Sequence, residues 1–409
     1  MPIAQIFVLV TIAGTLAGVA FGRCPGLQMN RATIVLVGAT VLLLLGAISL
    51  EEAYRAVDMN TIVLLFSMMA LNINLRLAGF FKLVSARIIL LAKTPRQLLA
   101  FIVAASGFLS ALFLNDTIAL MFTPIVLEVT KSLKRNPVPY LIGLATAANV
   151  GSAATIVGNP QNMLIGMASE IPFVTFAAYL IPPSLAGMII VWLILTMLYR
   201  SEFANGPLTV ECPLPLNYFK PLLVKSLIAT ALMLGAFVAG APIPLAALGA
   251  ASLLLVTRRL KPQRVFREID WSLLVFFAGL FVVTRSIGTS GLGDRVFSTA
   301  MPLVDDGIVP LAILSAAMSN IVSNVPAVLL FSPVIENAVK AVPSWITLAM
   351  ATTFAGNLTL LGSVANLIVA ESAKQGGVEL SFKEYLKAGI PITIITLFAG
   401  IFWLKWLFG

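Results

Sequence analysis

The chain has 409 residues, of which 59% are hydrophobic and only 11% are charged, and its mean hydropathy is +1.02. This composition excludes an ordinary soluble domain, and the absence of histidine excludes His-based catalysis, histidine-ligated haem and His-containing zinc motifs. The net charge of +9 reflects membrane topology rather than nucleic-acid binding, and Cys24 and Cys212, both in predicted loops, predict neither a disulfide framework nor a metal site.

Apolar runs of about 18 residues or more recur along the whole chain, so the sequence predicts a polytopic α-helical membrane protein. The first run has no small-residue cleavage pattern, and we expect it to be kept as a helix. Two segments, 97–134 and 308–340, are apolar but broken in the middle, and we predict that they are re-entrant hairpins. The predicted spans are 3–22, 32–50, 60–80, 138–170, 178–199, 221–240, 242–257, 271–287, 343–374 and 385–408.

The basic residues favour this hairpin assignment. With the N-terminus outside and both hairpins returning to the side from which they entered, most of the 26 Lys and Arg residues fall in inside loops. A hairpin that crossed the membrane fully would reverse this sorting downstream. The sequence therefore predicts a multi-pass protein of the cell inner (plasma) membrane, with 131–135 inside and 336–340 outside.

Two halves of the sequence resemble each other. The matching blocks, in the same order, are "TIVLLFSMMAL" (61–71) with "SLLVFFAGLFV" (272–282), "NDTIALMFTPIV" (115–126) with "NVPAVLLFSPVI" (324–335), and "GNPQNMLI" (158–165) with "GSVANLIV" (362–369). They predict two repeats, 1–199 and 221–409, each of five transmembrane helices plus one re-entrant hairpin, joined by a cytoplasmic linker at 200–220. Because five crossings is an odd number, the second repeat is inverted.

Each repeat is predicted to contain a discontinuous helix at the centre of the protein, at 138–170 and at 343–374. Irregular backbone at membrane depth is tolerated only where it is buried in protein or lines a water-filled cavity. We expect Gly158 to Asn162 to be an unwound joint in which Pro160 starts the second half-helix, with Gly362 to Asn366 as its counterpart. The asparagines can satisfy freed backbone groups or face a ligand, and half-helix N-termini suit oxygen-rich solutes.

The hairpin tips are also polar. Asn115, Asp116 and Thr117 lie between two apolar arms of the first hairpin, and Ser323 and Asn324 occupy the equivalent place in the second. Asp116 is the one carboxylate that we place deep in the protein, and an intramembrane acid is by default a functional hypothesis. Two structural alternatives stand beside it: Asp116 as the N-cap of the second hairpin arm, and the asparagines as interhelical hydrogen-bonding residues.

These motifs resemble those of the ArsB-type arsenite/antimonite efflux permeases of the ion transporter (ArsB/NhaD) superfamily. The resemblance covers nearly the whole chain, and "NDTIALMFTP", "GNPQNMLIG", "SNVPA" and "GSVANLIVAES" carry it. It implies a central site framed by two hairpin tips and two unwound helices, with Asp116 as the proton-coupling residue. The implied substrate-binding residues are Asn115, Thr117, Gly158, Asn159, Pro160, Gln161, Asn162, Ser323, Asn324, Gly362, Ser363 and Asn366.

The resemblance predicts a secondary active transporter that exports arsenite or antimonite in exchange for protons, by elevator-type alternating access and without a cofactor. It further implies a homodimer in the lipid bilayer and, in some relatives, a cytoplasmic ATPase subunit; this chain has no phosphate-binding Gly-x-x-x-x-Gly-Lys-Ser/Thr motif of its own. A membrane-embedded enzyme would need a nucleophile–base pair or a metal dyad. With no histidine and one deep aspartate, we do not expect this chain to be an enzyme.

One departure keeps an alternative open. The related sodium/dicarboxylate symporters carry Ser-Asn-Thr at each hairpin tip, whereas the tips here read Leu-Asn-Asp and Ser-Asn-Val. The lost hydroxyls and the gained carboxylate favour proton coupling over sodium coupling. A sodium/proton antiporter or a sodium-coupled anion transporter of the same superfamily is the alternative.

Overall fold

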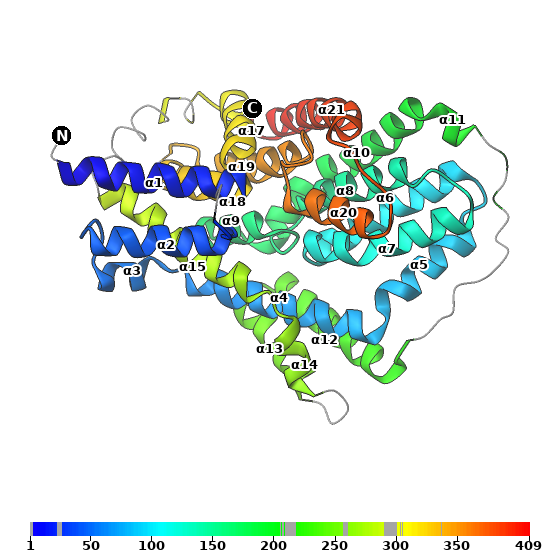
Figure 1. Cartoon of the computed structure of the whole chain (residues 1–409), viewed down its shortest axis with the longest axis horizontal. Coiled ribbons are helices and arrows are strands. Elements are labelled where there is room, and N and C mark those ends of the chain that lie inside the picture. The colour runs from blue at the N-terminus through cyan, green and yellow to red at the C-terminus, as the bar shows by residue number, and fades with distance from the viewer. Residues whose placement is uncertain are drawn as a thin grey trace.

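The protein is described here by a computed structural model, which covers residues 3–22, 27–204, 206, 208, 218–256, 261–289, 301–302, 304, 306–336 and 338–409. Within these ranges all regular structure is helical (Figure 1), which confirms the predicted all-α class. Cys24, Cys212 and most of the predicted linker 200–220 lie outside the described residues.

The described part of the chain contains twenty helices. Their bounds are α1 (Ile3–Phe21), α2 (Arg31–Leu44), α3 (Leu50–Ala56), α4 (Met59–Ala78), α5 (Phe80–Leu91), α6 (Pro95–Leu112), α7 (Asn115–Ser132), α8 (Pro137–Ser152), α9 (Pro160–Ser169), α10 (Phe173–Leu198), α11 (Arg200–Phe203), α12 (Lys220–Val238), α13 (Ile243–Leu255), α14 (Pro262–Glu268), α15 (Trp271–Thr289), α17 (Ile308–Val322), α18 (Asn324–Glu336), α19 (Ala341–Ala355), α20 (Val364–Gln375) and α21 (Phe382–Phe408).

Six helices in the described part are long and apolar enough to cross a bilayer, namely α4, α6, α10, α12, α15 and α21. Several of them expose large apolar side chains, such as Phe108, Phe398 and Phe402. A soluble protein rarely exposes contiguous apolar surface of this kind, whereas lipid tails cover it at no cost. The outer helices therefore face the hydrocarbon core.

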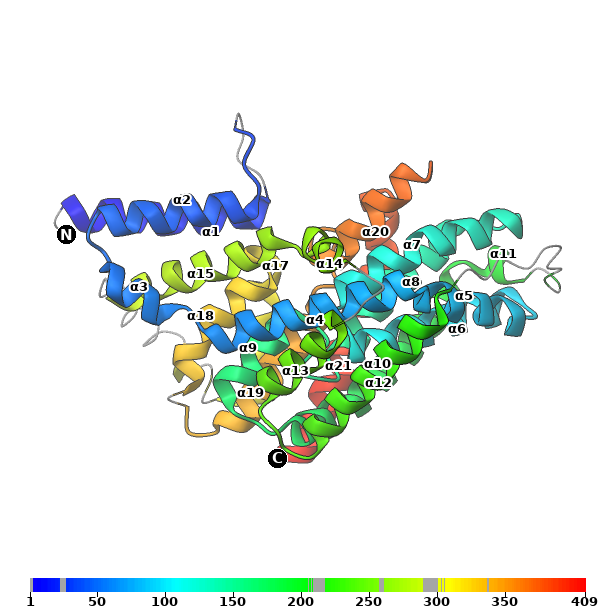
Figure 2. The ribbon, with the colours of Figure 1, turned by 90° about the horizontal axis from the view of Figure 1, so that it is seen from below.

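The two halves of the chain contact each other in a reciprocal pattern. α6 packs on α8 as α17 packs on α19, and α7 packs on α20 as α18 packs on α9. α2 packs on α15 as α13 packs on α4, and Figure 2 shows α2 beside α1 along the side of the molecule where α15 lies. α10 and α21 pack on each other. Exchanging the halves thus maps each of these helix pairs onto another pair or onto itself.

Two hairpins and two interrupted helices meet in the middle of the molecule. α6 and α7 are separated by only two residues, 113–114, and α17 and α18 by Ser323 alone. The first interruption, 153–159, separates α8 from α9, and the second, 356–363, separates α19 from α20. Each irregular segment starts and ends earlier than the predicted joint, at 153–159 instead of 158–162 and at 356–363 instead of 362–366. Pro160 is the first residue of α9 and Val364 the first residue of α20.

The connection between the predicted span 60–80 and the predicted hairpin 97–134 is not a plain loop, because it contains the helix α5. Gly79, at φ 85°, ends α4 in the left-handed conformation and lets the chain turn into α5. Phe81, Ser85 and Ile88 are buried at helical spacing, whereas Lys82 and Arg87 are exposed. The charges that marked this segment as a loop instead form the polar face of an amphipathic helix.

Candidate functional site

The interrupted helices and hairpins enclose a small central cavity of about 50 Å³. Its wall contains residues from both hairpin tips, from the start of α9 and from the end of the second interruption, together with Phe276 and Phe277 of α15 and Arg31 of α2. The structure thus brings together side chains that are far apart in the sequence. The predicted site residues that line this cavity are Asn115, Asp116, Pro160, Gln161, Ser323, Asn324 and Ser363.

Four helix N-termini converge on the central cavity. Asn115, Pro160, Asn324 and Val364 are the first residues of α7, α9, α18 and α20, and each of them lines the cavity. The first turn of a helix leaves backbone N–H groups without intrahelical partners and carries the positive end of the helix dipole. The positive ends of four helix dipoles therefore face the cavity, which suits a solute that presents oxygen atoms.

A chain of buried carboxamides connects the two halves behind the cavity. Asn149 is its centre: its Oδ1 accepts hydrogen bonds from Asn115 Nδ2 at 3.1 Å and from Ser363 Oγ at 2.9 Å. Its Nδ2 donates to Asn357 Oδ1 at 2.8 Å and to Asn366 Oδ1 at 3.0 Å. A fully satisfied network of this kind fixes the first hairpin tip against the second interrupted helix.

Sequence reasoning missed Asn149 and Asn357. Both are buried in apolar surroundings, and they stand 208 positions apart, close to the spacing between the repeated blocks. An asparagine recurring at the repeat spacing within apolar helices was the signal that could have identified them.

Asn162 and Asn366 have the same role in the two interrupted helices. Each is completely buried, and neither is among the residues that line the central cavity. The Asn162 Nδ2 donates to the carbonyls of Ser152 (3.3 Å), Ala153 (3.2 Å) and Thr155 (2.9 Å), and the Asn366 Nδ2 donates to those of Gly356 (2.8 Å) and Thr359 (3.1 Å). These side chains satisfy carbonyls that the unwinding frees.

Gly158, Asn159 and Gly362 shape the interruptions rather than the cavity wall. Gly158 accepts a hydrogen bond from the Asn115 backbone N–H at 3.0 Å, and a Cβ at this glycine would lie 2.2 Å from the carbonyl oxygen of Ser152. A Cβ at Gly362 would lie 2.8 Å from the carbonyl oxygen of Gly356. Asn159 caps α9, since its Oδ1 accepts from the Asn162 backbone N–H at 2.8 Å.

Asp116 is not a helix cap, so that alternative is wrong. The N-cap of α7 is Leu114, and α7 has no side-chain capping hydrogen bond. Among the described residues, no hydrogen bond to the Asp116 carboxylate and no ion pair within 4 Å is present. Arg31, half-buried at the start of α2, lines the same cavity and attracts Asp116 electrostatically. The carboxylate is therefore available to a proton or a solute.

A second cavity of about 200 Å³, which we call the vestibule, adjoins the central cavity. Both cavities include Asp116, Leu273 and Val364 in their walls. Thr117 lines the vestibule and not the central cavity. Glu268, which is partly buried, and Asp270, which is exposed, also line the vestibule.

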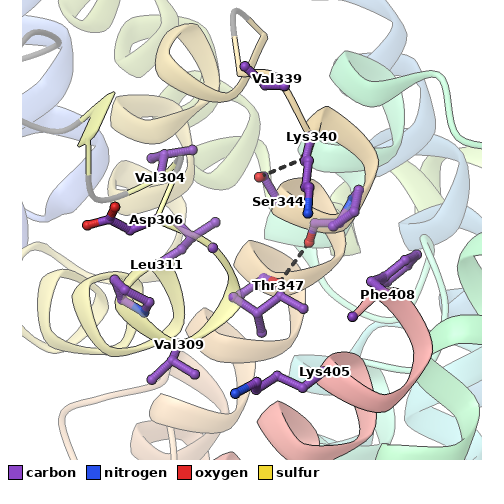
Figure 3. A pocket seen from close by; sticks show the side chains of 15 residues that line it. Val304, Asp306, Val309, Leu311, Val339, Lys340, Ser344, Thr347, Lys405 and Phe408 are labelled. Atoms are coloured by element: carbon purple, nitrogen blue, oxygen red, sulfur yellow. Dashed lines mark hydrogen bonds between the residues drawn. The ribbon is translucent and has the colours of Figure 1, made fainter.

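A third cavity, of about 410 Å³, is larger than these two but lies elsewhere. Figure 3 shows Lys340, Asp306 and Lys405 around it, at the start of α17 and α19 and the end of α21. Its lining includes no predicted site residue. Size alone would favour it, but the convergence of helix N-termini and buried carboxamides identifies the central cavity as the candidate site.

Ser323 is held in an unusual backbone conformation beside the central cavity. Its φ is 79° and its ψ 159°, a region that is almost restricted to glycine. The following residue, Asn324, accepts a short hydrogen bond from the Ser319 hydroxyl, which in turn is near the carbonyl of Thr352 at 3.2 Å. The surrounding contacts thus impose a strained turn at the second hairpin tip.

Comparison with known proteins agrees with this architecture. The family pattern described as citrate transporter (CitMHS) matches residues 7–355. The chain belongs to the CitMHS family. The expected kinship with the ion transporter superfamily is thereby confirmed, whereas a specific kinship with arsenite permeases stays a prediction.

Similar proteins are named as transporters or membrane proteins. The silicon efflux transporter LSI3 of Oryza sativa subsp. japonica is 29% identical, over 93% of this chain and 93% of its own. The 46 kDa membrane protein of Mycobacterium leprae is 30% identical over 97% and 99% of the chains. A Dictyostelium discoideum protein with the transporter name arsB is 27% identical over 92% and 87%.

The solved structure of the YdaH transporter from Alcanivorax borkumensis has a similar fold. Its TM-score is 0.60 at 14% sequence identity, over 99% of this chain and 98% of that one. The likeness concerns the fold alone. Family and fold together make this CitMHS member a membrane transporter and not an enzyme.

Proposed function

We propose that this CitMHS member exports a small uncharged hydroxylated metalloid, arsenite or antimonite, from the cytoplasm in exchange for protons. The central cavity carries the proposal. A water molecule needs roughly 10–15 Å³ of such volume, so about 50 Å³ admits a solute of a few polar atoms and not a tricarboxylate. At neutral pH arsenite is an uncharged triol, which can both donate and accept hydrogen bonds.

The chemistry of the lining matches such a triol. Carboxamides of Asn115, Gln161 and Asn324 and the hydroxyl of Ser363 line the cavity, with the four helix N-termini. These groups bind oxygen atoms weakly and reversibly, whereas thiolates would hold arsenic tightly. The names of the rice silicon efflux transporter and of the Dictyostelium arsB transporter support the same solute class, because dissolved silicon is also an uncharged hydroxylated species.

In this proposal Asp116 carries the proton. Its carboxylate lies at the junction of the two cavities and is free of hydrogen-bond partners among the described residues. A proton and a solute hydroxyl therefore compete for the same oxygen atoms. Binding of one displaces the other, which couples their movements in opposite directions.

The proposal includes inverted repeats and elevator-type movement. The reciprocal contacts, with α7 on α20 and α18 on α9, support a pseudo-two-fold relation between the halves. The distribution of basic residues supports an outside N-terminus and an inner-membrane location. The resemblance to arsenite permeases supports a homodimer and, for some members, a cytoplasmic ATPase subunit.

A sodium-coupled anion transporter is the second candidate. Arg31 and the helix N-termini in the central cavity favour an anion as the transported species. Replacement of sodium by choline separates the two candidates, since it leaves proton-coupled export unchanged and abolishes sodium-coupled transport.

Accumulation of arsenite and antimonite in cells tests the function directly. Cells without an arsenite exporter of their own are compared with and without this chain. We expect the chain to lower intracellular arsenite and to raise the concentration at which growth stops. Equal accumulation in both strains, with the protein present in the membrane, would contradict the proposed function.

A further inference from the structure

The third cavity has positive side chains in its wall that are not paired. Within the described part of the chain, the charged side chains in this wall are Asp306, Lys340 and Lys405, and neither lysine forms an ion pair within 4 Å. Figure 3 shows Lys340 pointing toward the cavity and Lys405 along its opposite edge, whereas the Asp306 carboxylate points away from both lysines. The wall therefore presents positive charge to an occupant of the cavity.

Two helix ends add to this charge. The first turn of α17 lines the cavity with Ile308, and the start of α19 lines it with Pro343 and Ser344. The positive end of each helix dipole faces the same space as the lysines. Lysines and helix ends together favour an anion.

Aromatic side chains at the end of α21 place the cavity at the membrane–water interface. Trp403 and Trp406 pack beside Lys405 with ring centroids 5.2 Å apart, and Phe408 is in the cavity wall. Tryptophan is enriched at the depth of the lipid headgroups, and lysines near the ends of transmembrane helices extend to the same depth. The two lysines are therefore at the level where lipid phosphates lie.

An exposed apolar surface runs from this level toward the hydrocarbon layer. Phe398, Phe402 and Trp406 recur every four residues, so they share one face of α21, and each is at least 69% exposed. The cavity wall is itself largely apolar, with Ile308 and Phe408 among its residues. Acyl chains can cover this face where the headgroup occupies the cavity.

Positive charge at headgroup depth beside an apolar surface is the pattern of a lipid headgroup site. We propose that the third cavity binds the headgroup of an anionic phospholipid. Its phosphate oxygens accept hydrogen bonds from Lys340 and Lys405, and its acyl chains lie on the exposed face of α21. The cavity volume of about 410 Å³ is within the range of small-molecule sites. This lipid site is separate from the central cavity and does not rest on the proposed function.

Native mass spectrometry of the delipidated protein in detergent measures the first lipid that binds. Phosphatidylglycerol, which is anionic, is compared with phosphatidylcholine of the same acyl chains, which is zwitterionic. Wild-type protein binds phosphatidylglycerol at the lower concentration. Lys340→Ala combined with Lys405→Ala weakens phosphatidylglycerol binding about tenfold, since each lysine at a membrane surface contributes up to roughly fivefold.

Lys131→Ala combined with Lys383→Ala is the matched control. Both lysines are exposed and line none of the three cavities, so the net charge falls by the same amount while the third cavity is unchanged. This control binds phosphatidylglycerol as wild type does. Equal losses in the two double variants would overturn the lipid site, as would equal affinity of wild type for the two lipids.

Inorganic phosphate separates a lipid site from a site for a free anion. Phosphatidylglycerol raises the Tm of wild-type protein in detergent, because a ligand that binds the folded state stabilises it, and raises that of the Lys340→Ala, Lys405→Ala variant less. Inorganic phosphate at the same concentration leaves the wild-type Tm unchanged, because it makes no apolar contacts. An equal rise of the Tm with inorganic phosphate would overturn the assignment to a lipid. None of these measurements involves transport.

Discussion

Replacement of Asn162 by leucine should destabilise the first interrupted helix without changing the side-chain volume of the core. The side chain is completely buried, and its Nδ2 donates to three backbone carbonyls, of 152, 153 and 155, at 3.3, 3.2 and 2.9 Å. Leucine has a similar volume, so no cavity forms. Two N–H donors are lost and the carbonyls stay buried without them, which we expect to cost about 2–4 kcal/mol in the free energy of unfolding.

Thermal unfolding of the purified protein in detergent measures this cost. Asn162→Leu should lower the Tm by several degrees and abolish arsenite export while protein remains in the membrane. Asn74→Leu is the control, because it removes an equally buried carboxamide that makes one hydrogen bond, at 2.8 Å, within an uninterrupted helix. If the two variants lose the same stability, or if Asn162→Leu exports as wild type does, the hydrogen bonds from Asn162 to these carbonyls are not what stabilises the interruption.

Three other predictions concern the joint, the central charge and the topology. Gly158→Ala places a Cβ 2.2 Å from a backbone oxygen and should abolish export. Gly235→Ala, whose Cβ has no atom within 4 Å, should not change export. Equal activity of the two variants would contradict the close packing at Gly158. Arg31→Gln should lower arsenite export strongly, because the fixed charge of Arg31 balances Asp116, and Arg31→Lys should retain part of the export. Arsenite uptake by everted vesicles measures both, and an active glutamine variant would show that the charge is dispensable. Cysteines at Lys134 and Lys340 should react with impermeant reagents from opposite sides, and labelling from one side would contradict the inverted repeat.

The residues that break apolar runs were readable from the sequence. Glycine, proline and carboxamides are costly in a transmembrane helix, so "GNPQN" predicts an interruption, and Pro160 indeed begins α9. The exact irregular segment, 153–159, was not predictable from this motif. It depends on carbonyls that Asn162 captures from seven to ten positions earlier, which is a tertiary arrangement.

Side chains that reach the site from other helices could not be predicted from the sequence. Arg31 looks like an ordinary loop charge, and only the packing of α2 on α15 brings it to the cavity that contains Asp116. In the sequence, Asn149 is a polar residue in an apolar helix. Its importance follows only from its hydrogen bonds to Asn357 and Asn366 in the other half. Local patterns identify the breaks, whereas the partners of each break follow from the three-dimensional fold.

Arsenite uptake into everted membrane vesicles under an imposed pH gradient, acidic inside, tests the central claim most directly. Asp116→Asn keeps the size of the side chain and one acceptor oxygen but removes the titrating proton. We predict that wild-type vesicles accumulate arsenite in response to the gradient, and that Asp116→Asn vesicles with equal protein do not accumulate it. Accumulation by Asp116→Asn at the wild-type level would contradict proton coupling through Asp116.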